Sequence, residues 1–129
     1  MAPPRKAQVL SHRDLIVWQR ALDLVRETYR VTAGFPRREE FGLVSQMRRA
    51  AVSVSANIAE GHARGTTKDY LRFLSIANGS LRELETYWDV VLMLKYVGPE
   101  QLAKTLELGE ETGRMLMSLS AALRRKPDR

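Results

Sequence analysis

Between residues 46 and 64, side chains that form specific hydrogen bonds recur at steps of three and four. This spacing places them on one face of a helix. The row consists of Gln46, Arg49, Ser53, Asn57, Glu60 and Arg64. It lacks the Lys and Glu mixture of an ordinary solvated face, and most of its side chains are short or have well-defined hydrogen-bonding geometry. The row therefore predicts a helix that packs through a specific polar contact, within one subunit or between subunits.

Two adjacent arginines on this helix, Arg48 and Arg49, have two possible partners. If the helices on either side of residue 65 run antiparallel, both arginines lie opposite Glu83 and Glu85. An Arg–Glu pair there would fix the register of the two helices, which is the best-attested use of a buried ion pair. The guanidinium group also matches the geometry of a phosphate, so phosphate binding is the second interpretation.

Small and polar residues also interrupt the next helical segment, at Asn78, Gly79 and Ser80. Ser53 and Asn57 can form hydrogen bonds across helices, and a glycine permits close approach at a cost in helix stability. We therefore predict a polar seam between two helices, made of Gln46, Ser53, Asn57, Glu60, Gly79, Ser80, Glu83 and Glu85. Packing between helices is one interpretation of this seam, and a surface for a polar ligand or an oligomer axis is the other.

Templates for catalysis and metal binding do not fit the sequence. Bundle di-metal sites need Glu-x-x-His motifs on two helices, whereas His12 lies in the leading segment and His62 follows Glu60 by two positions. The serines have no identifiable histidine base, and no glycine-rich phosphate loop or dinucleotide motif is present. We therefore expect a protein that is not an enzyme and that uses no metal or cofactor.

The net charge of +6 is concentrated towards the two ends of the chain. Arg5 and Lys6 precede the helices, and a basic cluster closes the last one, so residues 13–123 carry a net charge of only +1. Basic residues at chain ends can bind phosphate by counterion release, or can simply keep a protein soluble. If the chain binds RNA or DNA, its candidate phosphate contacts are Arg48, Arg49, Arg64, Lys68, Arg124, Arg125 and Lys126.

Four helical segments position these side chains, over residues 13–33, 40–63, 67–97 and 99–125. Apolar residues recur at helical spacing in each, and in the second they are Val44, Met47, Ala51, Val54 and Ile58. Glycine or proline separates the segments, as at Gly98-Pro99. Thr66 and Asp69 have the spacing of a capping box. Short connections make sequential helices antiparallel neighbours, so we predict an all-α, up-down-up-down antiparallel four-helix bundle over residues 13–125. Flexible tails are expected at 1–12 and 126–129.

The apolar stripes on the first and third helices are wider than one bundle core requires. The first helix has a main line and a second line, which are Leu15, Trp18, Leu22, Val25, Tyr29 and Thr32, and Val17, Leu24 and Val31. The main line of the third helix is Tyr70, Leu74, Ala77, Leu81, Leu84, Trp88 and Val91. A wide apolar flank marks a partner surface, and symmetric homo-oligomers are the commonest way to bury one. We therefore expect self-association.

Two glycines four residues apart, Gly109 and Gly113, lie on the apolar face of the last helix. Each lowers helix propensity by roughly 1 kcal/mol relative to alanine. Close approach of another group to the backbone explains such a cost, and Trp18 or Trp88 is the expected group.

The composition places the chain among soluble proteins of the cytoplasm. It contains no cysteine, so disulfides and thiolate metal sites are excluded. No apolar run approaches the roughly 18 residues that span a bilayer, so no membrane association is expected. The first residues, MAPPRKAQVLSHR, lack the apolar core of a signal peptide.

Three segments together resemble a known family. They are Ser45 to Ala50 (SQMRRA), Asn57 to Gly61 (NIAEG) and Gly79 to Thr86 (GSLRELET). They resemble the small four-helix-bundle proteins first noted in intervening sequences of bacterial 23S ribosomal RNA genes. The likeness extends in order over residues 13–97, and Ser55 stands where the family often has proline.

The resemblance implies a cytoplasmic all-α bundle that assembles as a ring-shaped homopentamer. It also implies a distant likeness to the accessory protein of diversity-generating retroelements, a pentamer that binds nucleic acid and reverse transcriptase. The family's ribosomal label reflects gene location, and its molecular function is mostly unassigned. We therefore expect a non-enzymatic homo-oligomer that binds RNA or DNA through backbone phosphates. The alternative is a protein-interaction scaffold with no nucleic-acid role.

Overall fold

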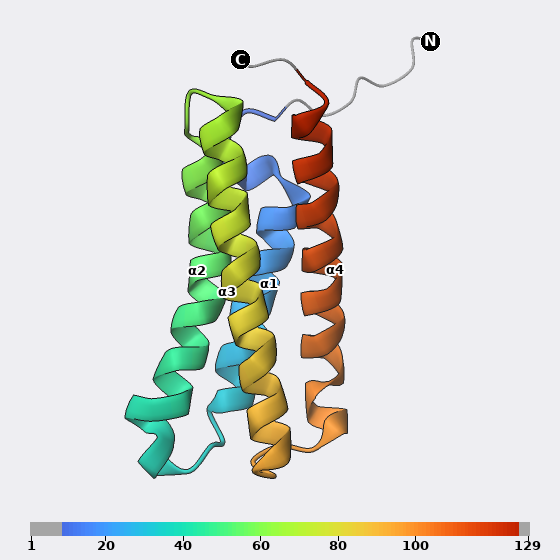
Figure 1. Ribbon diagram of the computed structural model, residues 1–129. Coiled ribbons are helices and arrows are strands. Elements are labelled where there is room, and N and C mark those ends of the chain that lie inside the picture. Colours follow the sequence, from blue (N-terminus) through green and yellow to red (C-terminus); the bar gives the residue numbers. More distant parts are fainter. Residues whose placement is uncertain (1–8, 127–129) are drawn as a thin grey trace.

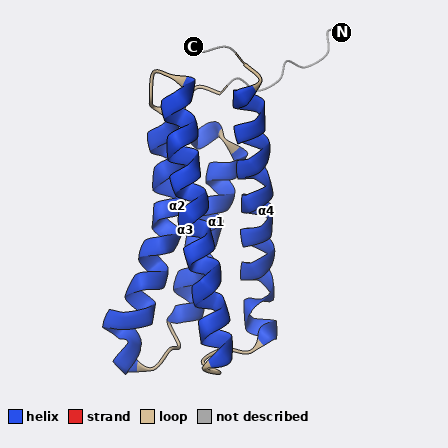
Figure 2. Cartoon of the chain, viewed as in Figure 1, coloured by secondary structure: helices blue, strands red, loops and turns tan. Residues whose placement is uncertain are grey.

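The computed structural model describes residues 9–126, and the regular structure in that range is helical, without a strand (Figure 2). Its long helices are α1 Ile16–Thr32, α2 Ser45–His62, α3 Thr67–Met93 and α4 Pro99–Arg124. The prediction of an all-α chain with four helices is therefore confirmed. Residues 1–8 and 127–129 of the predicted tails lie outside the described residues, and the predicted limits of the domain stay predictions.

Short helical turns connect and precede these helices. A 3₁₀ turn, His12–Asp14, comes before α1, where the Asp14 carboxylate accepts hydrogen bonds from the backbone N–H groups of Leu10 and Ser11. A second 3₁₀ turn, Arg37–Glu39, and a π-helical segment, Glu40–Val44, join α1 to α2. Gly42 in that segment has φ −106° and ψ −110°, outside the helical range, so the chain bends sharply before α2 begins.

The four helices lie side by side, and each packs against its sequence neighbours, while α1 also packs against α4 (Figure 1). The start of α1, the α2–α3 turn and the end of α4 lie at one end of the bundle. We call this the turn end, comprising residues 12–14, 59–73 and 123–126. The α1–α2 and α3–α4 connections lie at the opposite end. Residues distant in sequence therefore meet at the turn end.

The apolar lines predicted for α2 and α3 are the ones that form the core. Val44, Met47, Ala51, Val54 and Ile58 are all buried on the α2 side. The predicted line of α3 from Tyr70 to Val91 is buried throughout, with Trp88 only 1% exposed. At roughly 25 cal/mol per Å² of buried apolar surface, these lines provide the main driving force for folding.

On α1 the line that faces the core differs from the predicted main line. Val17, Ala21 and Leu24 are buried, whereas Leu22 and Tyr29 are 39% and 44% exposed. The core line also contains threonines, because the Thr28 hydroxyl donates to the Leu24 carbonyl at 2.8 Å and so is satisfied within its own helix. Packing of α1 against both α2 and α4 thus buries Val17 and Leu24 of the predicted second line. Leu22 and Tyr29 of the predicted main line remain exposed, as expected for an apolar flank.

Two glycines let α3 approach its neighbours closely. A Cβ at Gly109 of α4 would lie 2.7 Å from Cη2 and 2.8 Å from Cζ3 of Trp88. A Cβ at Gly61 of α2 would lie 2.9 Å from the Phe73 Cβ. The predicted contact between Gly109 and Trp88 is therefore confirmed, whereas Gly113 lies beside Leu81, with its Cβ position 3.4 Å from Cδ2.

The third helix ends earlier than the sequence pattern predicts. The apolar period continues to Val97, but α3 stops at Met93 and Leu94 is its C-cap. Lys95 follows with φ 61°, in the left-handed region that a helix cannot continue through. The N–H of Tyr96 then bonds to the Val91 carbonyl at 3.0 Å, which closes the helix and turns the chain towards Gly98. Val97 is buried from this turn rather than from the helix.

Replacing Gly109 by alanine should lower the free energy of unfolding by about 1–2 kcal/mol, because overpacking against the buried Trp88 outweighs the gain in helix propensity. The matched change Gly113→Ala should be neutral or should stabilise by up to about 1 kcal/mol, since its Cβ meets only an ordinary contact. Urea denaturation followed by circular dichroism measures both. Equal effects of the two changes would contradict the packing argument.

Candidate functional site

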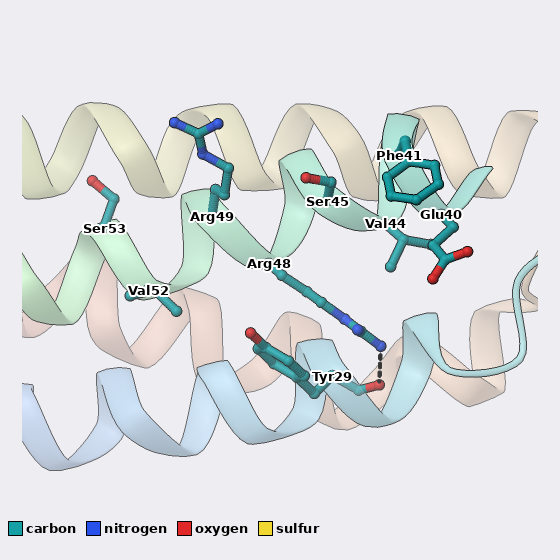
Figure 3. Close-up of a pocket in the computed structure, with 9 residues that line it drawn as sticks. All are labelled: Tyr29, Glu40, Phe41, Val44, Ser45, Arg48, Arg49, Val52 and Ser53. Carbon is teal, nitrogen blue, oxygen red and sulfur yellow. Dashed lines mark hydrogen bonds between the residues drawn. The ribbon is translucent and has the colours of Figure 1, made fainter.

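Arg48 is fixed between α1 and α2 and does not reach α3. Its Nε donates to the Thr32 hydroxyl at 3.0 Å, and its Nη2 lies 3.4 Å from the Tyr29 carbonyl oxygen (Figure 3). The guanidinium carbon stands 4.3 Å from the centre of the Tyr29 ring, in cation–π contact. Arg48 therefore ties the two helices together, and its predicted pairing with a glutamate of α3 is wrong.

A groove of about 640 Å³ runs beside Arg48 between α1 and the start of α2. Figure 3 places Phe41 at one end of this groove and Ser53 at the other. Phe41 is 89% exposed, because the bend at Gly42 directs it away from the core. Val52 and Tyr29 add exposed apolar area along the same groove. An exposed aromatic side chain beside such a groove is typical of a contact surface rather than of a solvated helix.

Arg49, the next residue along α2, points to a different surface. With Gln46, Ser53, Ser80 and Glu83 it lines a polar pocket of about 460 Å³ between α2 and α3. The two helices bring Arg49 and Glu83 to one pocket, as the antiparallel argument requires. However, within residues 9–126 no ion pair within 4.0 Å involves either side chain. The predicted Arg–Glu bridge is therefore absent among the described residues.

Three of the eight residues predicted for the polar seam are joined by hydrogen bonds. The hydroxyl oxygens of Ser53 and Ser80 lie 2.8 Å apart across the α2–α3 interface. The Asn57 amide donates to the Ser53 carbonyl at 2.8 Å and to its hydroxyl oxygen at 3.0 Å. These bonds satisfy polar groups that are half-buried, so this part of the seam serves packing between helices. Gln46 and Glu83 lie beside this centre, in the same pocket.

Three other predicted members lie outside the seam. Glu60 is exposed and pairs with Arg64 one turn later on α2. Glu85 pairs with Arg82 and faces the α3–α4 groove instead of α2. Gly79 is exposed, and no described atom lies within 4 Å of the position its Cβ would occupy. The expectation that Gly79 lets α2 approach α3 is therefore wrong, because Gly61 has that role.

The other predicted phosphate contacts gather at the turn end. Arg64 and Lys68 flank the α2–α3 turn, and α4 ends at the same end of the bundle with Arg124, Arg125 and Lys126, all exposed. The structure adds Arg13 and Arg72, which the sequence argument missed. Arg72 follows Lys68 by four positions, a helical spacing that could have identified it. Arg48 and Arg49 do not join this group, because they lie about four helical turns, or about 23 Å, along α2 from Arg64.

Arg64 and Arg72 are held in place by one aromatic ring. Their guanidinium carbons lie 4.7 Å and 4.6 Å from the centre of the Phe73 ring. Arg64 also pairs with Glu60, while the Arg72–Asp69 separation is a loose 3.9 Å. Both arginines remain accessible, with side chains 42% and 60% exposed. Because stacking uses only the face of each guanidinium, the N–H groups that these carboxylates do not engage can bind a further anion.

Charge is distributed unevenly along the bundle. Residues 9–126 contain eighteen Lys and Arg and fourteen Asp and Glu. Seven of the basic residues lie at the turn end, against Asp14, Glu60 and Asp69. The remaining eleven basic residues are matched by eleven acidic ones. The whole excess of +4 in the described chain therefore lies at the turn end. Hydrogen bonds from the backbone N–H groups of Leu10 and Ser11 lower the pKa of Asp14. The carboxylate of Asp14 is therefore already bonded within its own turn.

One carboxylate is buried away from these surfaces. Glu27 of α1 has a side chain only 8% exposed, and Arg30 donates to it at 2.8 Å. This hydrogen bond is the main reason that the pKa of Glu27 lies below its ordinary value of 4.5, and the charge of Lys104 on α4 acts in the same direction. Glu27 therefore has a structural role in the contact of α1 with α4.

Two kinds of site are absent from the described part of the chain. Residues 9–126 contain no cluster of three or more His, Asp or Glu side chains that could hold a metal ion. Across the same residues, no helix has the length and apolarity needed to cross a membrane.

Comparisons with known proteins identify a family and a similar fold. Residues 13–118 match the family model described as 23S rRNA-intervening sequence protein. Among solved structures, the chain is similar to a protein of unknown function from the S23 ribosomal protein family of Bacteroides thetaiotaomicron, with a TM-score of 0.73 and 22% sequence identity. That alignment covers 81% of this chain and 98% of the other, and at this identity it supports the fold alone. No curated protein matches the chain significantly.

Replacing Glu27 by glutamine should lower the free energy of unfolding at pH 7 by about 1 kcal/mol, because a charge-assisted hydrogen bond is lost. A carboxylate whose pKa is lowered by folding stabilises the folded state above its unfolded pKa. That contribution disappears as the pH falls below 4.5 and through the folded pKa. The difference between the variant and the wild type should therefore narrow in acid, as urea midpoints at pH 7 and pH 3 would measure. Glu110→Gln, at a 77% exposed side chain, is the control and should change neither value. A difference as large at pH 3 as at pH 7 would contradict this account.

Proposed function

The chain belongs to the 23S rRNA-intervening sequence protein family, and we propose that it is a non-enzymatic homo-oligomer that binds RNA or DNA through backbone phosphates. The observation that carries this proposal is the segregation of charge: the entire net positive charge of residues 9–126 lies at the turn end. Phosphate contacts supply most of the sequence-independent affinity for nucleic acid, and they need such a concentration of accessible cations.

The side chains at the turn end suit a phosphate backbone better than they suit a small anion. Arg64 in the α2–α3 turn is followed by Lys68 and Arg72 in the first two turns of α3, and the Arg124–Lys126 cluster lies at the same end of the bundle. They are spread over an exposed surface instead of converging on one point. Arg64 and Arg72 are partly ordered by Phe73, so less side-chain freedom is lost when they bind. Contacts of this kind position a nucleic acid without reading its sequence.

Arg48 and Arg49 have other assignments in this proposal. Arg48 is bonded to α1, and a phosphate would have to compete with Thr32 and the Tyr29 ring for its guanidinium group. Arg49 shares its pocket with Glu83, whose charge would repel a phosphate. The phosphate-binding residues proposed from the sequence therefore reduce to those at the turn end.

In this proposal each subunit is an up-down-up-down antiparallel bundle, and several subunits form a closed ring. The short connections and the pairwise packing of α1 with α2, α2 with α3, and α3 with α4 support the topology. Exposed apolar side chains support the assembly: Phe41 is 89% exposed, Met93 71% and Met117 62%. A ring would bring several turn ends together and multiply weak phosphate contacts. Five subunits is the number that the family resemblance implies.

A protein-interaction scaffold is the second candidate, and Phe41 favours it. This side chain and the groove beside it form an apolar contact surface far from the turn end. A scaffold of this kind would use the basic residues only for solubility. In both candidates the chain acts by binding in the cytoplasm. No catalytic group is assigned, because the sequence fits none of the catalytic and metal templates considered above.

The assembled protein should have about five times the subunit mass of 14.7 kDa in dilute solution. Light scattering coupled to size exclusion gives this mass directly. A particle of one subunit at all concentrations would rule out the oligomer, and a closed oligomer of another number would correct only the stoichiometry.

Removing the three cations of the α2–α3 turn should weaken RNA binding and its salt dependence together. In the triple variant Arg64→Gln, Lys68→Gln, Arg72→Gln, the slope of log K against log salt should become shallower by about 2–3. Filter binding across a salt series, with single-stranded and duplex probes of RNA and DNA, measures the slope.

The matched control removes three cations from the opposite end, in the variant Arg37→Gln, Arg38→Gln, Lys104→Gln. This control should retain most of the affinity at equal net charge. Equal losses in the two variants would indicate that only overall charge matters. If the wild type binds no nucleic acid even at low salt, the nucleic-acid proposal fails and the scaffold remains.

A further inference from the structure

The aromatic rings of the turn end, with one exception, pack against other rings of the protein. Tyr70 is only 4% exposed, and the ring of His62 meets it edge to face, with 5.9 Å between the ring centres. The ring of His12 meets Trp18 in the same way, at 5.0 Å. The residues that precede and follow the described part of the chain are not aromatic. The half-buried Phe73 is therefore the ring of this end at which a nucleic-acid base would have to stack.

The Phe73 ring is already in contact with two guanidinium groups. The guanidinium carbon of Arg64 lies over the ring at 4.7 Å from its centre, and that of Arg72 lies over it at 4.6 Å. The base of the Phe73 side chain lies against the backbone of α2, where a Cβ at Gly61 would be 2.9 Å from the Phe73 Cβ. A base that stacked on a covered face would have to displace a guanidinium and lose its cation–π contact. The ring therefore supports arginines instead of a base.

A site with accessible cations and covered rings distinguishes between the two forms of nucleic acid. Proteins that bind single strands gain a factor of about 5 to 150 in affinity for each base that stacks on an aromatic side chain. In a double helix the bases are stacked on one another, and the phosphates lie outside. Each phosphate contact also contributes more to the salt dependence of binding for a duplex, by about 0.9 against about 0.7 for a single strand. The turn end therefore matches the outside of a double helix.

The order of the cations also suits a double helix. Arg64 and Arg72 are held over Phe73, and Lys68 precedes Arg72 by one turn on α3, about 6 Å along the helix axis. A duplex is stiff over about 150 base pairs, so its phosphates keep a fixed arrangement. When ordered cations meet an ordered row of phosphates, neither partner loses much conformational freedom. A flexible single strand would lose more.

We propose that the turn end binds the phosphate backbone of a double helix in preference to a single strand, with Phe73 as a positioning residue for Arg64 and Arg72. This inference rests on the proposed function and names the class of nucleic acid that the same site accepts. Phe73 itself does not touch the nucleic acid. It orders two guanidinium groups whose side chains are 42% and 60% exposed and which make the contacts.

The wild-type protein should bind a short RNA or DNA duplex at least about tenfold more tightly than an unpaired strand of the same length at the same salt concentration. Oligo(U) and oligo(dT) are the unpaired probes, because they form no stable hairpin. Fluorescence anisotropy with labelled probes, repeated over a salt series, measures each affinity. The RNA and DNA arms show which of the two duplexes the site prefers.

The variant Phe73→Leu tests the positioning role, because it removes the ring and keeps an apolar side chain against Gly61. Affinity for the duplex should fall by about threefold to tenfold, while the salt slope stays unchanged because both arginines remain. The matched control is Tyr29→Leu, which removes the ring beside Arg48 at the opposite end of α1 and should keep the duplex affinity. Circular dichroism and urea midpoints show whether each variant is folded.

The outcomes distinguish this inference from the proposed function on which it rests. If the wild type binds unpaired strands as tightly as duplexes, the inference fails and nucleic-acid binding stands. If it binds none of the probes even at low salt, both fail. A folded Phe73→Leu variant that loses affinity for oligo(U) or oligo(dT) more than for the duplex would make Phe73 a stacking platform and would overturn the inference. The comparison of probes on the wild type decides the preference even if Phe73→Leu does not fold.

Discussion

The close contact of Trp88 with the bare backbone of Gly109 sets the spacing on which the rest of the bundle depends. The largest buried side chain of α3 occupies the volume that a Cβ on α4 would need, so α3 and α4 can approach only at a glycine. Gly61 has the same role on the other side, where α2 meets Phe73 and Tyr70. With both distances fixed, α3 is held between α2 and α4, and its long apolar line is buried along its full length.

This close packing determines where the polar groups lie. Because α2 and α3 approach at Gly61, the hydroxyls of Ser53 and Ser80 come within 2.8 Å further along the interface. The neighbouring arginines of α2 then diverge, since consecutive helix positions point about 100° apart. Arg48 lies against Tyr29 of α1, while Arg49 lies over the pocket shared with Glu83. One arginine therefore ties α2 to α1, and the other lines the pocket between α2 and α3.

The fold also separates charge along its axis. Most ionic residues on the body of the bundle are balanced by residues of opposite sign, which limits long-range attraction to any one partner. At the turn end three segments distant in sequence contribute basic residues, and few carboxylates oppose them. The net positive charge of the described residues therefore lies at one end of the bundle, and this separation is the observation on which the proposed function rests.

The sequence by itself determined the helices, the core lines of α2 and α3, and the need for close approach at Gly109, because each follows from helical periodicity and local propensity. It also located the cations around Arg64. It misjudged the core line of α1 and the end of α3, since two apolar lines satisfy the same period and the left-handed Lys95 has no local signal. Only the tertiary structure decided which face each polar side chain joins: Arg48 turns to α1, Glu85 turns to α4, and Gly79 lies open. Those choices depend on how helices rotate against one another, and rotation is set by packing across the whole bundle.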